Sequence, residues 1–577
     1  MNFLPRKPLD RSKPNRRDFM VQTGAASIGV TSIVNSIAQL KLVGAAAAQG
    51  AASGDYKALI CVFLNGGMDT NNLLIPFTGG AGTARAQYDS GRGIPTYAGG
   101  QGGIAIPAAD ISAAGTQIAP DNAVSEYEPA SGYISADGNG NRFGIHPGAL
   151  HLKNMFDAGD LAFVCNVGSL TQPNVTRANY SNLAASQRPP QLFSHSDQQV
   201  QWQSSLAGRA FTSGWGGRIA DILDSVHNLD PESLSMSVSV NGINSFQKGI
   251  QQQPYVMAST GVSSYSGYGA PYTTSLINSD FQPFSGYNPF SDANYNVSGS
   301  NMYQGRRLQA LEQILAMSHA NLFDQGYVNV SKNARVTEGL VGSALALTDT
   351  TPEGSTTTST ALDTFFDNAF AGSGLATTED FARQLKMVAR LILGNSVLKN
   401  KRQIFFVQLG GWDTHTSQIP VNTDGTAART DQGYYRLIRL LSCSLKGFYD
   451  SINSVPGLWD NVMAFTASDF TRTFTPNKTD ATGGSDHGWG GHMMVMGGSV
   501  KGKRIYGTFP DLTTNGGIDV QGNRGRWIPT TSVDQYAAVI AKWFGVSPAQ
   551  MGGVFPNLSR FTDPFTPAAK LDFVDYV

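Results

Sequence analysis

Charged residues are scarce in this sequence, and their signs nearly cancel. Only 14% of the 577 residues are Asp, Glu, Lys or Arg, and the formal net charge is −1, whereas the charged fraction of a typical soluble domain is about 25%. A nucleic-acid partner is therefore not expected, because no basic excess exists to attract phosphates. Gly, Ser, Thr, Asn and Gln replace the missing charge, which predicts a neutral surface rich in loops.

Cysteines and long apolar runs are also few. The three cysteines, Cys61, Cys165 and Cys443, are too sparse and odd in number for a disulfide framework. Cys61 and Cys165 stand in apolar runs that are typical of strands, so we expect them to be small, buried hydrophobic residues. Beyond the N-terminal segment no further run of about 18 apolar residues occurs, so no membrane span is expected in the mature chain.

The N-terminal segment has the pattern of an export signal. The pair Arg16–Arg17 precedes a weakly apolar stretch, Val21–Val43, and the alanines Ala45–Ala48 resemble a small-residue cleavage site. The paired arginines predict export by the twin-arginine translocase, and a Sec signal or a membrane anchor is the alternative. We therefore expect residues 1–48 to be a signal peptide, residues 49–577 to form the domain, and the protein to be periplasmic or secreted.

Apolar runs and helical periodicity alternate along the chain. The runs that predict buried strands are Tyr56–Leu64, Asp160–Gly168, Arg402–Leu409 and Asn461–Ala467. The segments with helical spacing are Arg306–Phe323, Thr378–Leu398, Gln432–Ile452 and Ser532–Phe544. This alternation predicts an α/β fold in which helices flank a mostly parallel sheet. Residues 251–305, rich in Gly, Ser, Tyr, Asn and Pro, are expected to form a long irregular cap insertion.

Three polar turns carry the residues that suggest chemistry. Asp486, His487 and His492 lie in a glycine-rich loop, Asp413 and His415 follow one predicted strand, and Asp69 follows another. Functional residues of such sheets collect at the carboxyl ends of the strands, so we expect these side chains to converge. Carboxylate and imidazole groups are the donors that a catalytic divalent metal needs.

Each of these turns also has a simpler interpretation. Asp69 can be an ordinary turn residue or a helix N-cap. Asp413 can cap the following helix and leave His415 exposed, and the loop with Asp486 and His487 can be a disordered polar loop. The metal interpretation is favoured because several turns of one composition follow predicted strands.

Asp469 and Arg472 follow the fourth predicted strand, and Ser194 precedes His195. Asp469 can be a metal ligand, can orient a ligand, or can pair with Arg472. Arg472 can hold an anionic group through two hydrogen bonds, or only pair with Asp469. Ser194 can be a metal-activated nucleophile, although a single Ser-His pair is a weak signal. The G-x-S-x-G motif that is typical of many serine hydrolases is absent from the sequence.

Mixed Asp and His ligation fits zinc, alone or with a harder ion such as magnesium, calcium or manganese. Two ions a few ångströms apart would clamp the attacking and leaving oxygens of a phosphoryl-type transfer.

The set of motifs resembles the DUF1501 family of exported twin-arginine bacterial proteins. The motifs that carry the resemblance are Gly66–Asp69, Ser194–His195, Gly411–His415, Ser468–Thr473 and Ser485–Gly488. That family is similar to the alkaline phosphatase and sulfatase superfamily, in which an early Asp, a nucleophile, two Asp/His pairs and a late His surround two metals. The Cys-x-Pro-x-Arg context of formylglycine sulfatases is absent, which disfavours that mechanism.

The resemblance implies a role for each candidate residue. The metal ligands would be Asp69, Asp413, His415, Asp469, Asp486, His487 and His492, with Ser194 in the nucleophile position and Arg472 beside the anion. Two of these matches differ in detail, since the pair Asp413 and His415 is closer by two residues than the superfamily pattern, and Asp469 stands where family members often have Glu.

The expected function is therefore metal-dependent hydrolysis of a phosphate or sulfate ester in an alkaline-phosphatase-like fold. The alternative is a non-catalytic secreted binding or assembly protein whose metal only stabilises the fold. The family resemblance also suggests a partner, an exported protein of the DUF1800 type.

Overall fold

The computed structural model describes most of the expected domain. The described residues are 56–95, 102–230, 233–261, 361–420, 430–515, 517 and 520–576, with residues 340–345 and isolated residues between 303 and 314. The expected signal peptide, most of the expected cap insertion and most of the helix expected at Arg306–Phe323 lie outside these residues. The chain divides into two compact units, and every element named below belongs to the larger, residues 48–231, 235–260 and 351–577.

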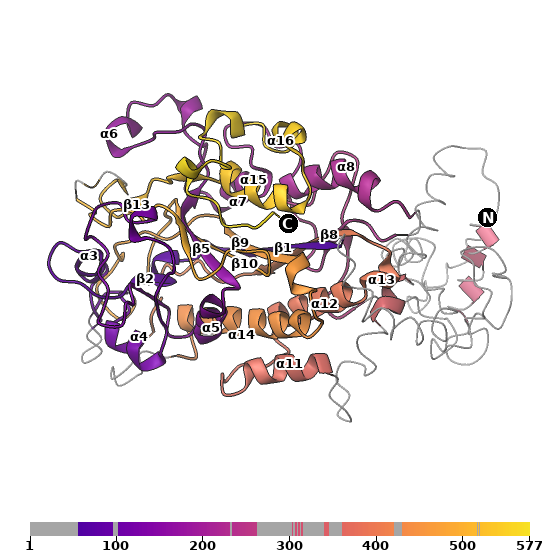
Figure 1. Cartoon of the computed structure of the whole chain (residues 1–577), viewed down its shortest axis with the longest axis horizontal. Coiled ribbons are helices and arrows are strands. Elements are labelled where there is room, and N and C mark those ends of the chain that lie inside the picture. Colours follow the sequence, from indigo (N-terminus) through magenta and orange to yellow (C-terminus); the bar gives the residue numbers. More distant parts are fainter. Residues whose placement is uncertain are drawn as a thin grey trace, which may run out of the picture. The chain divides into compact units, whose positions relative to one another are not determined.

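A nine-stranded sheet runs through the larger unit (Figure 1). Its strand order is β11-β5-β10-β9-β1-β8-β6-β7, and β14 pairs with β5. All pairs are parallel except those that β10 makes with β5 and β9. The strands are β1 Lys57–Leu64, β5 Leu161–Gly168, β6 Ser237–Ser239, β7 Tyr255–Val256, β8 Arg402–Leu409, β9 Val462–Ser468, β10 Gly491–Gly497, β11 Ile505–Gly507 and β14 Thr531–Ser532.

Helices cover both faces of this sheet (Figure 1). One face carries α5 Leu150–Ala158, α12 Asp380–Leu393 and α14 Gly433–Asn453, and α11 Ala361–Phe370 packs on α12 and α14. The other face carries α7 His195–Ser204, α8 Trp215–His227, α15 Val533–Phe544 and α16 Pro548–Val554. An α/β fold with a mostly parallel sheet flanked by helices is thus confirmed. Two small sheets stand apart: β2 Leu74–Pro76 with β4 Phe143–Ile145 and β3 Gln117–Ile118, and the hairpin β12 Val520–Gln521 with β13 Arg526–Trp527.

The four expected strands correspond to β1, β5, β8 and β9, with ends that agree within one residue. The helix expected at Thr378–Leu398 is interrupted, since α12 ends before Gly394 and a short helix, α13 Asn395–Leu398, follows it. Helices α14 and α15 match their expected ranges closely.

The glycine-rich loop ends earlier in the structure than the sequence predicted, because β10 begins at Gly491. His492 was expected in the glycine-rich loop, but it lies on β10, where the apolar run Met493–Met496 continues the strand. Because β10 is buried on both faces, the His492 side chain is enclosed by protein. Strand β10 runs antiparallel to its neighbours, so it begins at the edge where β1, β8 and β9 end.

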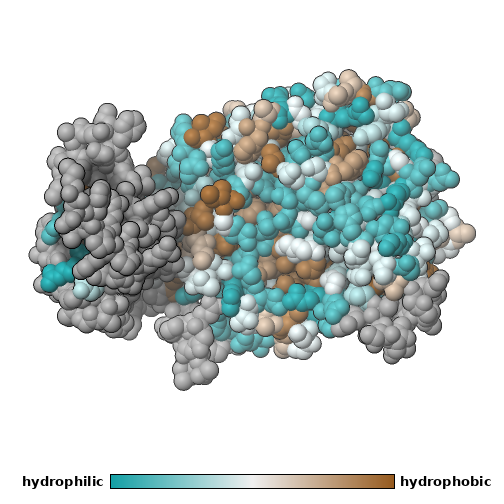
Figure 2. Space-filling view, turned by 180° about the vertical axis from the view of Figure 1, so that it is seen from behind, coloured by the Kyte–Doolittle hydropathy of each residue, from teal (hydrophilic) through white to brown (hydrophobic). Residues whose placement is uncertain are grey.

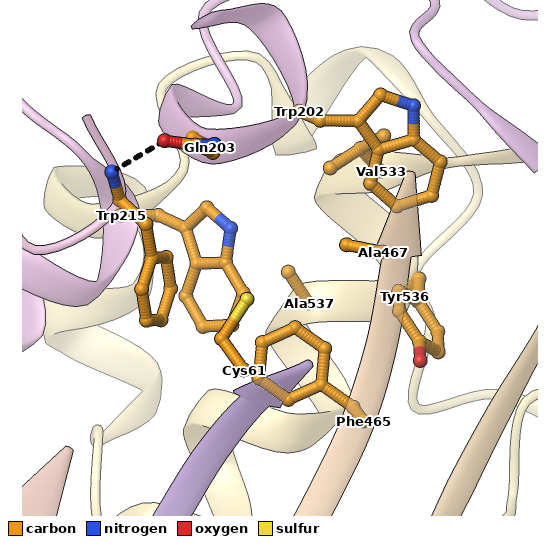
Figure 3. A pocket seen from close by; sticks show the side chains of 10 residues that line it. Cys61, Trp202, Gln203, Trp215, Phe465, Ala467, Val533, Tyr536 and Ala537 are labelled. Atoms are coloured by element: carbon orange, nitrogen blue, oxygen red, sulfur yellow. Dashed lines mark hydrogen bonds between the residues drawn. The ribbon is translucent and has the colours of Figure 1, made fainter. Parts of the chain in front are cut away.

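Aromatic and aliphatic side chains fill the layer between the sheet and α7, α8 and α15. A small cavity of about 10 Å³ remains there (Figure 3), which is about the smallest space that holds one water molecule. It is bordered by Cys61, Trp202, Gln203, Trp215, Phe246, Phe465, Ala467, Val533, Tyr536 and Ala537. Its lining is almost wholly apolar, so this space belongs to the packed core.

The surface and the cysteines agree with the expectations from composition. Polar side chains cover much of the face in Figure 2, and apolar ones are scattered among them. Cys61, Cys165 and Cys443 are buried and unpaired. Among the described residues no helix is both long and apolar enough to cross a bilayer.

A buried carboxyl group in α15 predicts a pH-dependent stability. Burial raises the pKa of Asp534 to about 7, although Ser205 and Arg218 oppose the shift. The unfolded state ionises near pH 4 and the folded state only near pH 7, so stability should fall as the pH rises between these values. Asp534→Asn should remove this fall, which amounts to at most about 4 kcal/mol.

Denaturant unfolding of both proteins at pH 4 and pH 8 measures the difference. The exposed Asp563→Asn variant serves as the control, and its stability should fall between pH 4 and pH 8 by as much as that of the parent protein. An equal change in the free energy of unfolding between pH 4 and pH 8 for the parent and Asp534→Asn would show that Asp534 ionises normally in the folded protein.

Candidate metal centre

Three distant segments bring histidine and aspartate side chains together. Asp413 and His415 lie in the turn after β8, and His487 lies in the loop before β10. His195 is the first residue of α7, which packs against β9. The carboxyl ends of β8 and β9 flank that of β1, and β10 starts beside β9, so all three segments reach one edge of the sheet.

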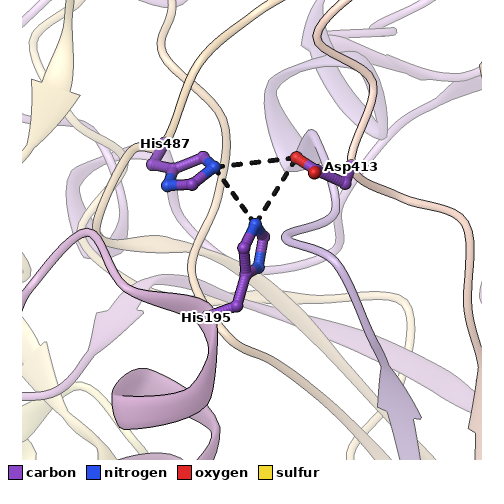
Figure 4. Close-up of side chains that lie close together, drawn as sticks. All are labelled: His195, Asp413 and His487. Carbon is purple, nitrogen blue, oxygen red and sulfur yellow. Dashed lines mark hydrogen bonds and ion pairs between the residues drawn. The ribbon is translucent and has the colours of Figure 1, made fainter.

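Four potential ligand atoms converge at this edge, three of them from the residues in Figure 4. Nε2 of His487 lies 3.1 Å from Nε2 of His195 and 3.0 Å from Nε2 of His415. Oδ1 of Asp413 lies 3.1 Å from Nε2 of His415, 3.5 Å from that of His195 and 3.6 Å from that of His487. Three imidazole nitrogens and one carboxylate oxygen form a typical donor set for a divalent transition metal.

The opposite ring nitrogen of each histidine is engaged by an acceptor. Nδ1 of His487 lies 2.6 Å from the backbone oxygen of Phe193. A carbonyl oxygen only accepts, so Nδ1 of His487 carries the proton and donates it. Nδ1 of His195 lies 2.7 Å from Oδ2 of Asp469, and this hydrogen bond raises the pKa of His195.

His415 repeats the arrangement with a different carboxylate. Its Nδ1 lies 3.0 Å from Oδ1 of Asp486, and Arg524 pairs with the other oxygen of that carboxylate. Burial favours the neutral form of Asp486, but hydrogen bonds from Asn477 and His415 and the charge of Arg524 outweigh it and lower its pKa. The carboxylate therefore stays ionised and accepts the Nδ1 proton of His415.

While the rings are neutral, these three hydrogen bonds leave the three Nε2 atoms as acceptors without protons. Acceptors that face one another at 3.0–3.1 Å repel unless a cation or a shared proton lies between them. Zn–N bonds of about 2.0–2.1 Å at tetrahedral angles place neighbouring nitrogens about 3.3 Å apart, close to this spacing. His195, His487 and Asp413 thus fit one divalent cation, and His415 offers a further nitrogen beside His487 and Asp413.

Asp413 is the most exposed of the four, with 47% of its side chain accessible. Nη1 of Arg472 donates to its Oδ1 at 2.7 Å. Burial acts to raise the pKa of Asp413, but the charge and hydrogen bond of Arg472 lower it below the ordinary value. Arg472 itself is buried, and its other partners are the backbone oxygens of Gly66 and Ser485. Arg472 therefore orients Asp413 and is itself enclosed by protein.

Asp469 serves the cluster through His195. Its carboxylate also accepts the backbone N–H of Gly66 at 3.2 Å and an N–H of Gln199 at 3.1 Å. Gly66 has φ +114°, and a Cβ at this position would lie 2.7 Å from the backbone nitrogen of Asp413. Only glycine therefore lets the turn after β1 come this close to the turn after β8.

The side chains of three of the predicted site residues contact groups other than the four potential ligand atoms. The carboxylate of Asp69 is buried against Arg92 and Gln418. His492 is buried and stacked on Phe509, with ring centroids 5.0 Å apart, and burial lowers its pKa to about 3. The Ser194 hydroxyl donates to Oδ2 of Asp197 at 2.6 Å.

The structure thus brings Asp413, His415 and His487 together and sets Asp469 and Asp486 behind two of the histidines. His195 is the residue that sequence reasoning missed as a candidate ligand. Its signal was present in the Ser194–His195 motif, but the serine drew the interpretation toward a nucleophile. The convergence of His195 with a loop 292 residues later has no local signature.

The family model of DUF1501, described as a protein of unknown function, matches residues 56–520. The chain belongs to the DUF1501 family. The match includes the four proposed ligands of the metal centre and both carboxylates behind the histidines. No curated protein and no solved structure matches the chain.

Removal of one converging imidazole should abolish ion binding. His487→Ala should leave the purified protein without the divalent ion that the parent retains, because His487 contributes the nitrogen nearest to both other imidazoles. His151→Ala is the matched control, since that half-buried ring contacts the backbone oxygen of Ala369, far from the centre in the sequence. Elemental analysis that finds equal ion content in all three proteins would contradict the assigned ligand set.

The carboxylate behind His415 should tune the affinity. Asp486→Asn keeps the size of the side chain but removes the charge that holds Nδ1 of His415, so zinc affinity should fall about 10–100-fold. Competition with a chromogenic chelator measures this change. Asp480→Asn is the control, since the hydrogen bonds of the Asp480 side chain go only to Thr482 among the described residues. An unchanged affinity in Asp486→Asn would remove Asp486 from this role.

Proposed function

We propose that this protein is an exported, metal-dependent hydrolase of a phosphate or sulfate ester. Its metal would be held by His195, His487 and Asp413, with His415 as a further candidate ligand beside them. The observation that carries the proposal is the convergence of three Nε2 atoms, each on a ring whose Nδ1 is held by an acceptor. A cation between neutral rings would make this arrangement of lone pairs favourable.

Zinc is the ion that this donor set favours. Three nitrogens and one oxygen suit zinc, and manganese is the next candidate, whereas magnesium and calcium prefer oxygen ligands. The three mutually close ligand atoms support one ion, so the two-ion arrangement of the superfamily is not required for this proposal.

Exposure of the ligands favours catalysis over a purely structural metal. Side chains of Asp413 and His415 are 47% and 42% exposed, whereas structural zinc sites are closed. Oδ1 of Asp413 is also shared with Arg472, so this ligand is a weaker donor than a free carboxylate. Solvent and a small ester can therefore approach the ion from the Asp413 side.

A divalent cation at this position would supply Lewis-acid chemistry, stabilising charge on a phosphoryl or sulfuryl oxygen and favouring the ionisation of water. In the proposed reaction, water attacks phosphorus or sulfur, the ester P–O or S–O bond breaks, and the alcohol leaves with a proton. The protein fixes the three imidazoles and excludes water behind them, where Phe470 stacks on His487 with ring centroids 4.7 Å apart.

In the proposed reaction the attacking group is water, whereas the sequence suggested Ser194. The Ser194 hydroxyl is directed to Asp197 and has a further contact only with Ser196, at 3.3 Å, among the described residues. Its nearest carboxylate is therefore not one of the groups that hold the histidines.

An alkaline-phosphatase-like architecture is part of the same proposal. The mostly parallel sheet, its helices on both faces and a metal centre at the carboxyl ends of β8 and β9 support it. Export by the twin-arginine route rests on the Arg16–Arg17 motif. That route carries folded proteins, which suits a chain that binds its ion before export.

A substitution series distinguishes the two attacking groups. Ser194→Ala should hydrolyse aryl phosphates or aryl sulfates within a few-fold of the parent rate, because water rather than the hydroxyl attacks. His195→Ala should lose both ion and turnover. Ser196→Ala is the matched control for the change at the helix start.

Turnover by the zinc-loaded parent on a panel of aryl phosphates, aryl sulfates and carboxylic esters measures the activity. A Ser194→Ala protein that keeps its ion and loses all turnover would restore the serine nucleophile. A zinc-loaded parent that hydrolyses none of the panel, yet melts at a much higher temperature than the zinc-free protein, would favour the structural role.

A further inference from the structure

The β12–β13 hairpin carries two arginines to the side of the metal centre. Arg524 lies in its turn and Arg526 begins β13. Arg524 pairs with Asp486, the carboxylate behind His415. Nε of Arg526 donates to the backbone oxygen of His487 at 2.9 Å. The hairpin therefore contacts the metal-centre loop at two consecutive residues, 486 and 487.

Backbone and side-chain contacts hold the hairpin in place. Phe474 and Thr475 donate their backbone N–H groups to the oxygens of Gly525 and Arg524, at 2.9 and 3.1 Å. Trp527 is buried, and its Nε1 donates to Oδ1 of Asn71 at 2.7 Å. These bonds fix the positions of both arginines before any ligand arrives, which lowers the entropy cost of binding.

Both guanidinium groups retain unused donors. The Arg526 guanidinium lies over the Phe193 ring, 4.1 Å from its centroid, and its two Nη groups contact no acceptor in the described part of the chain. Arg524 is 42% exposed, and only its Nη1 is engaged within the same residues. A guanidinium with free, planar donors beside a metal centre suits an oxyanion.

The two arginines repel each other in the absence of a ligand. Burial lowers the pKa of Arg526, and the positive charge of Arg524 lowers it further. An anion between them would remove this repulsion. Arg472, the arginine that the sequence suggested for this purpose, has its contacts on Asp413 and on backbone oxygens.

The charges of the centre indicate which anion fits. The carboxylates of Asp413, Asp469 and Asp486 are matched in number by the guanidiniums of Arg472, Arg524 and Arg526. A divalent cation then leaves two positive charges at the site. A phosphate monoester carries two negative charges above its second pKa near 6, whereas a sulfate monoester or a phosphodiester carries one.

We propose that Arg524 and Arg526 form an anion-binding subsite beside the metal centre that selects the dianion of a phosphate monoester. This inference rests on the proposed function and names its substrate class. Both arginines lie beyond the segment that matches the family model, which ends at residue 520.

The test uses methylphosphonate and methanesulfonate, which have similar shapes, cannot be hydrolysed as esters, and carry two charges and one charge at pH 8.5. Titration calorimetry on the zinc-loaded full chain should show at least tenfold tighter binding of methylphosphonate. Arg526→Gln and Arg524→Gln should each reduce that affinity about 10-fold or more, since each removes a charged hydrogen-bond donor, with zinc content unchanged.

Arg142→Gln is the matched control, because the Arg142 guanidinium also donates to a backbone oxygen, that of Ile134, and does not contact the centre. Arg524 is half exposed, so its variant should fold even if the Arg526 variant does not. Zinc-loaded variants that bind methylphosphonate like the parent would overturn the subsite and leave the hydrolase proposal standing. A parent chain that retains no divalent ion would instead overturn the metal centre itself.

Discussion

The geometry of the centre depends on where three imidazole protons are held. Asp469, Asp486 and the backbone oxygen of Phe193 each fix the Nδ1 proton of one histidine. Once those protons are placed, each Nε2 presents a lone pair, and the rings cannot turn without losing a hydrogen bond. The hydrogen bonds therefore hold the three rings in fixed orientations, and they explain why the two carboxylates lie behind the rings.

The sheet makes this arrangement possible. Parallel strands β1, β8 and β9 end at one edge, so the turns that follow them are neighbours, although 403 residues separate Gly66 after β1 from Asp469 after β9. The reversed strand β10 begins at that edge and brings the His487 loop back to it. Gly66 lets the first turn approach the second, because any side chain there would collide with the backbone of Asp413.

Arginines keep this acidic edge close to neutral. Arg472 lies on Asp413 and Arg524 on Asp486, so two of the three carboxylates have a cation at hydrogen-bond distance. The two arginines differ in solvent exposure, since Arg472 is enclosed by protein while the guanidinium of Arg524 reaches solvent. One guanidinium thus orients Asp413, a proposed metal ligand, and the hairpin carries the donors that we propose for the substrate.

The sequence alone determined the α/β class, the four central strands and the residue types of the centre. Apolar runs, helical periodicity and Asp/His turns are local patterns, and they identified Asp413, His415 and His487. Only the tertiary structure decided that His195 joins them, that Asp469 and Asp486 hold ring protons, and that Asp69 and His492 are enclosed elsewhere. The reason is physical: the role of each side chain depends on which group faces it, and His195 faces a carboxylate 274 residues away.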